Sequence, residues 1–269
     1  MTQDSKQDWG VFFTRISDKP ASVRLDLALR AKAPDAGQPR LFIATVTMRN
    51  PRDDGLSSSQ ESETLYAMED AIVAALSKKA KVTYAGVITS DGKRRYFFYA
   101  PPAENKAPSG WAGKFLGLNK KQDSLAGEVD TVMKTFPGYG YDCYEKDEPD
   151  WKGYLQMLYP NAWEMQTLMS LRVRGQMHSH GDQSHLPREI DHFIWCDSAE
   201  IQSQIMRQGE ALGFRVVASQ PSEKNNKYGV SLHKEGIPDD IDAIIRPLFE
   251  LAESLGADYD GWGATVVKA

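Results

Sequence analysis

Short apolar runs separated by turn residues predict an alternation of strands and helices along the chain. In the first 160 residues these runs are rich in Val, Ile, Phe, Tyr and Thr, which is typical of strands. They predict strands over residues 11–16, 22–29, 41–48, 81–88, 94–99, 139–145 and 151–158. The Asp91-Gly92 pair between two of these runs is a strong signal for a β-hairpin.

Two helices are expected in the same region, because apolar residues there recur every three or four positions. The first begins at Ser58, where Glu61 would complete a capping box, and ends near Lys79. The second covers residues 124–136. The irregular stretch 101–122 lies between them, and its large apolar residues are expected to pack onto the core: Trp111, Phe115 and Leu116.

The remaining residues predict one leading helix and then a strand, helix, strand, strand, helix and strand. Asn161 and Glu164 can cap the leading helix, and Asp197 with Glu200 can cap the next one. The last helix is expected to start at Pro238. A βαββαβ order is the ferredoxin-like pattern, in which both helices lie on one face of a four-stranded antiparallel sheet.

We therefore predict an α+β protein of two tandem domains. Residues 1–160 would form an α+β sandwich of unassigned function, related to the second domain by its strand–helix–strand order. Residues 161–269 would form the ferredoxin-like domain. The length of 269 residues suits two domains of ordinary size.

The charge is distributed unevenly along the chain. The whole sequence has 32 basic and 37 acidic residues, while residues 161–269 hold 10 basic and 16 acidic residues. This balance excludes a protein that binds nucleic acid through bulk charge, and an acidic domain suits a basic protein partner. The aromatic strand 94–99 lacks the glycines of an RNA-recognition signature, so direct nucleic-acid binding is not favoured.

Composition also suggests the compartment. No apolar run is long enough to span a bilayer, so no membrane partner is expected. Cys143 and Cys196 are far apart and belong to no Cys-x-x-Cys pair. We expect a cytoplasmic protein in a reducing environment.

Two segments of the second half carry a family resemblance. Gly181-Asp182 followed by Pro187-Arg188-Glu189-Ile190-Asp191-His192, together with Tyr259-Asp260-Gly261-Trp262-Gly263, resembles the regulators of ribonuclease E activity of B type. The first half resembles a domain of unknown function that is often fused to them. The resemblance implies a ferredoxin-like fold and a non-catalytic regulator that inhibits a ribonuclease by binding its basic scaffold region.

The candidate partner-binding residues come from these two segments. They are Arg188, Asp191, His192, Asp258, Tyr259, Asp260 and Trp262. Packing is the alternative for each aromatic residue, and a local ion pair is the alternative for Arg188. We expect Trp262 to belong to the core and the aspartates to steer a partner.

Catalytic motifs are absent from the sequence: it has no Gly-x-Ser-x-Gly elbow, phosphate loop, dinucleotide fingerprint or His-Glu-x-x-His. No catalytic residue, cofactor or metal site is predicted. The alternative is a metal-dependent hydrolase or another enzyme that uses the segment from His178 to His192. Its histidines match no standard zinc spacing.

Overall fold

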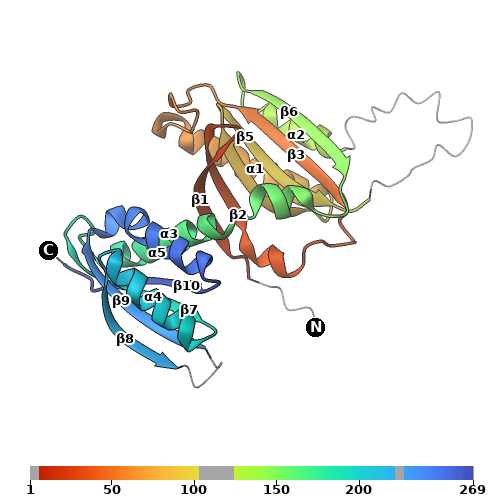
Figure 1. Ribbon diagram of the computed structural model, residues 1–269. Coiled ribbons are helices and arrows are strands. Elements are labelled where there is room, and N and C mark those ends of the chain that lie inside the picture. Colours follow the sequence, from red (N-terminus) through yellow and green to blue (C-terminus); the bar gives the residue numbers. More distant parts are fainter. Residues whose placement is uncertain (1–5, 103–123, 222–226, 269) are drawn as a thin grey trace, which may run out of the picture. The chain divides into compact units, whose positions relative to one another are not determined.

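The computed structural model describes residues 6–102, 124–221 and 227–268, and the chain divides into two compact units, Met1–Pro160 and Asn161–Ala269. Each unit holds one antiparallel sheet with helices packed on it, so the predicted α+β class is confirmed (Figure 1). Trp111, Phe115 and Leu116 lie outside the described residues. Within the described residues, no helix is both long and apolar enough to cross a membrane.

The N-terminal unit is built on six strands in the order β1-β2-β4-β5-β3-β6. Its elements in chain order are β1 (Trp9–Ile16), β2 (Lys19–Asp26), η1 (Leu27–Ala31), β3 (Arg40–Thr47), α1 (Ser59–Lys79), β4 (Thr83–Ser90), β5 (Lys93–Ala100), α2 (Leu125–Met133), β6 (Gly140–Asp147) and η3 (Gly153–Leu158). α1 and α2 pack against each other on one face of the sheet (Figure 1). The predicted apolar face of α1 is fully buried there: Leu65, Met68, Ile72 and Leu76.

The start of α1 was predicted correctly, but its capping box was not. The Ser58 side chain makes no hydrogen bond to the helix. The Glu61 carboxylate instead accepts hydrogen bonds from the backbone N–H groups of Arg49 and Asn50, each at 2.8 Å. Glu61 therefore ties the helix to the chain that follows β3 rather than to its own first turn.

Gly153–Leu158 form the short π-helix η3, so the strand predicted over residues 151–158 is wrong. The buried residues Trp151, Tyr154 and Leu158 are spaced three and four apart, as in a helix. Trp151 stacks on Tyr99 with ring centroids 3.8 Å apart, and the Glu148 carboxylate accepts a hydrogen bond from the Gly153 N–H at 2.8 Å. Together these contacts turn the chain onto the sheet face opposite to α1.

The C-terminal unit has the sheet order β10-β7-β9-β8, with every neighbouring pair antiparallel. Its elements are α3 (Ala162–Ser179), β7 (Arg188–Cys196), α4 (Ala199–Ala211), β8 (Arg215–Pro221), β9 (Tyr228–Gly236), η4 (Pro238–Asp240), α5 (Ile241–Ser254) and β10 (Asp258–Ala264). From β7 to β10 this is the predicted βαββαβ order of a ferredoxin-like fold.

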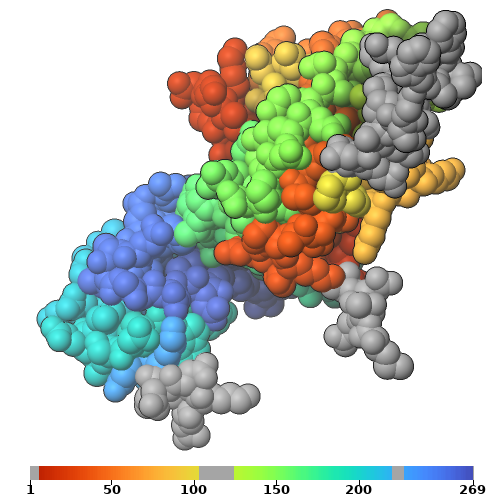
Figure 2. Space-filling view, turned by 90° about the vertical axis from the view of Figure 1, so that its right-hand side faces the viewer, coloured from red at the N-terminus to blue at the C-terminus, as the bar shows by residue number. Residues whose placement is uncertain are grey.

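All three helices of this unit lie on one side of the sheet. α4 and α5 lie side by side there, and α3 packs beside α5 over the edge strand β10 (Figure 1). In the space-filling view, the blue residues of the C-terminal part of this unit pack directly against its cyan residues (Figure 2). The core between helices and sheet contains Ile194, Leu232 and Leu248. The opposite face of the sheet has no helix on it among the described residues of this unit, and its side chains are exposed or half-buried, with Phe193 40% exposed.

Of the two helix caps predicted in this unit, one is present and the other is formed by a different residue. Asn161 and Glu164 form the predicted capping box, with hydrogen bonds of 2.9 Å in both directions. The cap of α4 is Ser198, whose hydroxyl accepts from the Ile201 N–H at 3.2 Å, and not Asp197. The short turn η4 at Pro238 precedes α5, and α5 continues through Pro247.

Candidate functional site

The alternation of side chains along β7 and β10 divides the predicted partner-binding residues between two faces of the sheet. His192, Tyr259 and Trp262 point toward the helices, because they lie in register with buried neighbours such as Ile194. Asp191, Asp258 and Asp260 are on the open side or at its edge. Arg188 stands at the start of β7, in a separate polar cluster.

His192 and Tyr259 form a polar pair in the interior. Nδ1 of His192 lies 2.8 Å from the Tyr259 hydroxyl, and Nε2 of His192 is buried without a hydrogen-bond partner. Burial, and then the charges of His233 and Lys234, lower the pKa of His192 to about 4. Burial also raises the pKa of Tyr259. Both side chains are therefore neutral near pH 7; His192 is fully buried and Tyr259 is half-buried.

Trp262 is a core residue, in agreement with the packing interpretation. Its indole N–H donates to the buried Ser170 hydroxyl of α3 at 3.1 Å. The ring packs among Met177, Ile190 and Ile245. Trp262 therefore connects the edge strand β10 to α3 and is not accessible to a partner in this structure.

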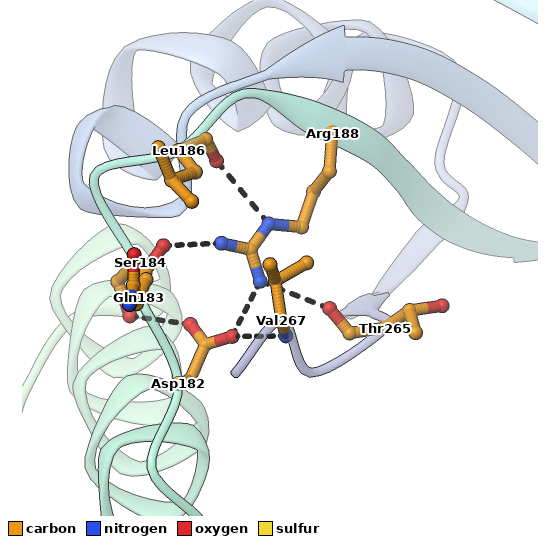
Figure 3. A network of polar contacts seen from close by, with 7 residues as sticks. All are labelled: Asp182, Gln183, Ser184, Leu186, Arg188, Thr265 and Val267. Carbon is orange, nitrogen blue, oxygen red and sulfur yellow. Dashed lines mark hydrogen bonds and ion pairs between the residues drawn. The ribbon is translucent and has the colours of Figure 1, made fainter. Parts of the chain in front are cut away.

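Arg188 belongs to a buried cluster that holds the chain after β10 (Figure 3). Its guanidinium donates to the Asp182 carboxylate at 2.5 Å and to the Thr265 carbonyl at 2.9 Å. Asp182 also accepts from the Val267 N–H at 2.7 Å and the Ser184 hydroxyl at 2.7 Å. Burial alone would raise the pKa of Asp182, but the Val267 and Arg188 donors outweigh it and lower the pKa to about 2. This arrangement is the local ion pair that was the alternative for Arg188.

An aromatic pair occupies the open face of the sheet. Phe193 is 40% exposed, and Trp195 lies two residues further along the same strand and is half-buried. Three of their four cross-strand neighbours are small: Ser231 and Gly261 flank Phe193, and Gly229 lies under the Trp195 ring. The fourth is Asp258, opposite Trp195 on β10. Small neighbouring side chains cover little of the two rings, so both rings are accessible to a partner.

Carboxylates surround this pair, and each has a local contact. The Trp195 indole N–H donates to Asp260 at 3.0 Å, and Lys227 pairs with Asp258 at 2.6 Å. Asp191 lies 2.8 Å from Nε2 of His233. These carboxylates place negative charge along β7 and β10, which would attract a basic partner.

One group of potential metal ligands is found among the described residues: Glu189, Asp191 and His233. The two ring nitrogens of His233 face different carboxylates, Glu189 at 2.8 Å and Asp191 at 2.8 Å. The Arg215 guanidinium also binds Glu189 and, with His233, lowers the pKa of its carboxyl group. An arginine already placed on a ligand opposes cation binding, so this group is best described as an ion-pair network.

The histidines of the alternative enzyme hypothesis do not converge. His178, His180 and His185 are exposed, and His192 is buried in the interior. Glu189 of this segment associates with His233 of β9 instead. The arrangement of this segment gives no support to a metal-dependent hydrolase.

Sequence reasoning missed Phe193, Trp195 and His233. The run from Phe193 to Cys196 is apolar throughout, so its residues carry no signal of which side chains face the core and which face solvent. Pairing with Gly229, Ser231 and Gly261 would have revealed the open face, but that pairing is known only once the strand register is known.

The C-terminal unit is thus a ferredoxin-like domain with a helix-covered face and an open face that carries aromatic and acidic side chains. The family model described as "Regulator of ribonuclease activity B" matches residues 170–264, as the resemblance of the second half predicted. Residues 7–108 match a family of unknown function, DUF695, as the resemblance of the first half predicted.

A search of the curated proteins found no match. Similar solved structures include an unknown protein from Galdieria sulphuraria, at 10% identity and a TM-score of 0.21 over 86% of this chain and 99% of that one. Another is the ferredoxin protease FusC in complex with Arabidopsis ferredoxin, at 10% identity and a TM-score of 0.24 over 93% of this chain and 38% of that one. At these scores the two likenesses carry no argument about fold or function.

Proposed function

We propose that the protein is a non-catalytic regulator that binds a ribonuclease of the ribonuclease E type and restrains RNA turnover. The open face of the C-terminal sheet is the binding surface in this proposal. The supporting observation is the pair of the exposed Phe193 and the half-buried Trp195, set among carboxylates in a domain that matches the model of a ribonuclease-regulator family. Accessible aromatic side chains are the residues that most often dominate binding energy at protein interfaces.

The charge of the domain suits a basic scaffold segment as the partner. Residues 161–269 carry a net charge of −6, from 10 basic and 16 acidic residues. Asp191, Asp258 and Asp260 place part of that charge on or beside the aromatic pair. Such charges act mainly on the rate of association and on selectivity. The aromatic rings contribute to affinity in the complex that has formed. His192, Tyr259 and Trp262 lie on the helix side of the same two strands and hold these strands in place.

The test is direct binding of the full-length protein to the basic scaffold segment of a ribonuclease E-type enzyme, at several salt concentrations. Phe193→Ala should weaken binding by about thirtyfold or more, which corresponds to the lower limit of about 2 kcal/mol for interface hot spots. Asp260→Asn should mainly slow association and flatten its salt dependence.

Met169→Ala is the matched control, because Met169 is 41% exposed on α3 and lies on the helix side of the same domain. It should bind as the unmodified protein does. Equal losses in Phe193→Ala and Met169→Ala, or no binding to the basic segment at low salt, would refute the proposed surface.

A further inference from the structure

A hollow of about 310 Å³ lies in the N-terminal unit beside α1. Two rows of cross-strand neighbours form its floor. One row runs through Phe13, Ser22, Thr89 and Arg94, and the adjacent row contains Val11, Arg24 and Val87. Residues that lie directly opposite one another across a sheet point to the same face. Tyr66 of α1 forms the wall, so the hollow lies where β1 and β2 extend past the flank of the helix.

The lining of this hollow is positively charged. It contains three arginines, Arg24, Arg52 and Arg94, and no aspartate or glutamate. Arg52 pairs with Asp54 at 2.6 Å in an exposed contact at the rim. Arg24 and Arg94 belong to the floor, on β2 and β5, which are the two neighbours of β4 in the sheet.

A single buried carboxylate stands behind these two arginines. Glu69 of α1 binds the guanidinium groups of both Arg24 and Arg94, the latter at 2.6 Å, and it also accepts a hydrogen bond from the Tyr84 hydroxyl at 2.9 Å. One carboxylate therefore faces two guanidinium groups. One positive charge at the floor is therefore left without a carboxylate. Because a buried charge is costly unless it is paired, an anion bound here would be stabilised.

The hydrogen-bonding capacity of the two arginines is also incompletely used. The Arg94 side chain is only 5% exposed and lies against the rings of Tyr66 and Tyr96, at 5.1 and 5.6 Å from their centroids. The Nε atoms of Arg24 and Arg94 are both buried and have no hydrogen-bond partner. Each guanidinium carries five N–H donors, so Glu69 cannot satisfy both groups.

Apolar side chains surround the charged floor. Phe13 is 59% exposed, Tyr66 is 52% exposed and Val11 is 39% exposed, and all three line the hollow. Large apolar side chains gathered around convergent polar groups are the usual composition of a small-molecule site, and a volume near 300 Å³ is at the lower end for such sites.

We propose that this hollow binds a small organic anion, with its carboxylate or phosphate group between Arg24 and Arg94 and a compact apolar group against Phe13 and Tyr66. Guanidinium groups favour these two anions because their planar donors match paired oxygens. The inference concerns the N-terminal unit alone and is independent of the binding surface proposed for the C-terminal unit.

Calorimetric titration of the full-length protein tests the proposal with four probes: 3-phenylpropionate, phenyl phosphate, inorganic phosphate and the uncharged 3-phenylpropanamide. The two aromatic anions should bind more tightly than inorganic phosphate, and the amide should not bind. The preference between 3-phenylpropionate and phenyl phosphate distinguishes a carboxylate ligand from a phosphate ligand.

Arg24→Gln should weaken the better aromatic anion by about tenfold or more, because a hydrogen bond to a charged group is lost. Tyr66→Ala removes apolar contact at an exposed position and should weaken the aromatic anions while leaving inorganic phosphate unchanged. Arg95→Gln is the matched control, since Arg95 is the next residue on β5 and points to the opposite face of the sheet.

Far-UV circular dichroism confirms that each variant is folded. The proposal is overturned if no anion binds at millimolar concentration, if the amide binds as well as the carboxylate, or if Arg24→Gln and Arg95→Gln behave alike. Binding of an acidic peptide without binding of either aromatic anion would also overturn it.

Discussion

The Tyr259 hydroxyl lies 2.8 Å from Nδ1 of His192, and the two side chains form a polar pair between the sheet and the helices of the C-terminal unit. The other ring nitrogen, Nε2, is buried without a partner. Protonation would thus place a charge where nothing accepts its second N–H. The pair is stable only while the imidazole is neutral.

This pair predicts acid sensitivity. Burial first, and then His233 and Lys234, lower the pKa of His192 to about 4, whereas an unfolded histidine titrates near 6.5. Between these values the unfolded chain binds a proton that the folded chain does not, so stability falls as the pH drops from 6.5 to 4. The expected loss is about 3 kcal/mol in the free energy of unfolding.

Urea unfolding across that pH range measures the effect. The variant His192→Gln cannot titrate and keeps an acceptor for Tyr259, so its stability should change less between pH 6.5 and 4. An equally steep pH dependence in the variant would show that another group is responsible.

The Asp182–Arg188 pair predicts a second, more acidic transition. The pKa of Asp182 is lowered to about 2 from an ordinary 3.8, so its contribution is present above pH 3.8 and is lost as the pH falls toward 2. Asp182→Asn should cost about 3 kcal/mol at pH 7, because it leaves a buried arginine without its carboxylate.

The double variant Asp182→Asn with Arg188→Met should recover part of that loss, since no buried charge remains. Urea unfolding of the single and double variants measures the coupling. Independent, additive losses would show that the two side chains do not act as a pair.

Trp262 provides a third prediction, on the link between β10 and α3. Trp262→Ala should lower the free energy of unfolding by about 3 to 5 kcal/mol, as expected for a buried aromatic side chain. Trp262→Phe should cost less, and most of its cost should disappear in a Ser170→Ala background, because the hydroxyl that loses its donor is then absent. If Trp262→Ala leaves stability unchanged and abolishes partner binding, the packing assignment is wrong.

A fourth prediction concerns the extent of the folding unit. The family match covers residues 170–264, but Asn161 caps α3, Trp163 packs on Phe249 with centroids 5.2 Å apart, and Val267 binds Asp182. A fragment of residues 161–269 should fold cooperatively, whereas a fragment cut to 170–264 should be markedly less stable. Near-UV circular dichroism during thermal unfolding compares the stability of the two fragments. Equal melting temperatures would contradict the prediction that the folding unit extends beyond residues 170–264.

Sequence periodicity was sufficient for most of the helices and for the strand order of the C-terminal unit, because these depend on local patterns. It failed where a distant contact decides local structure. Residues 151–158 read as a strand from composition, but the stacking of Trp151 on Tyr99 and the bond from Gly153 to Glu148 make them helical. Ser58 and Glu61 have the spacing of a capping box, yet Glu61 binds the backbone after β3.

The sites depend even more on tertiary contacts. The aspartates near β10 were predicted as site residues because they flank a motif, whereas Phe193 and Trp195 are part of a continuous apolar run. Arg24, Glu69 and Arg94 lie on three different elements, and nothing in their local sequence indicates that two guanidinium groups share one carboxylate. Such clusters can be recognised only after strand register and helix placement are known.

The strand order of the C-terminal unit also determines when this unit can fold during its synthesis. β7 is the first strand of the sheet to be synthesised, yet its two neighbours are β9 and β10, which come later. A nascent chain that ends before β10 leaves one hydrogen-bonding edge of β7 unpaired and leaves His192 without Tyr259. Nonlocal pairing of this kind slows folding and exposes strand edges in the meantime. The C-terminal unit is therefore expected to complete its sheet only after translation has passed residue 264, and a ribosome stalled before that point would present an incomplete sheet to chaperones.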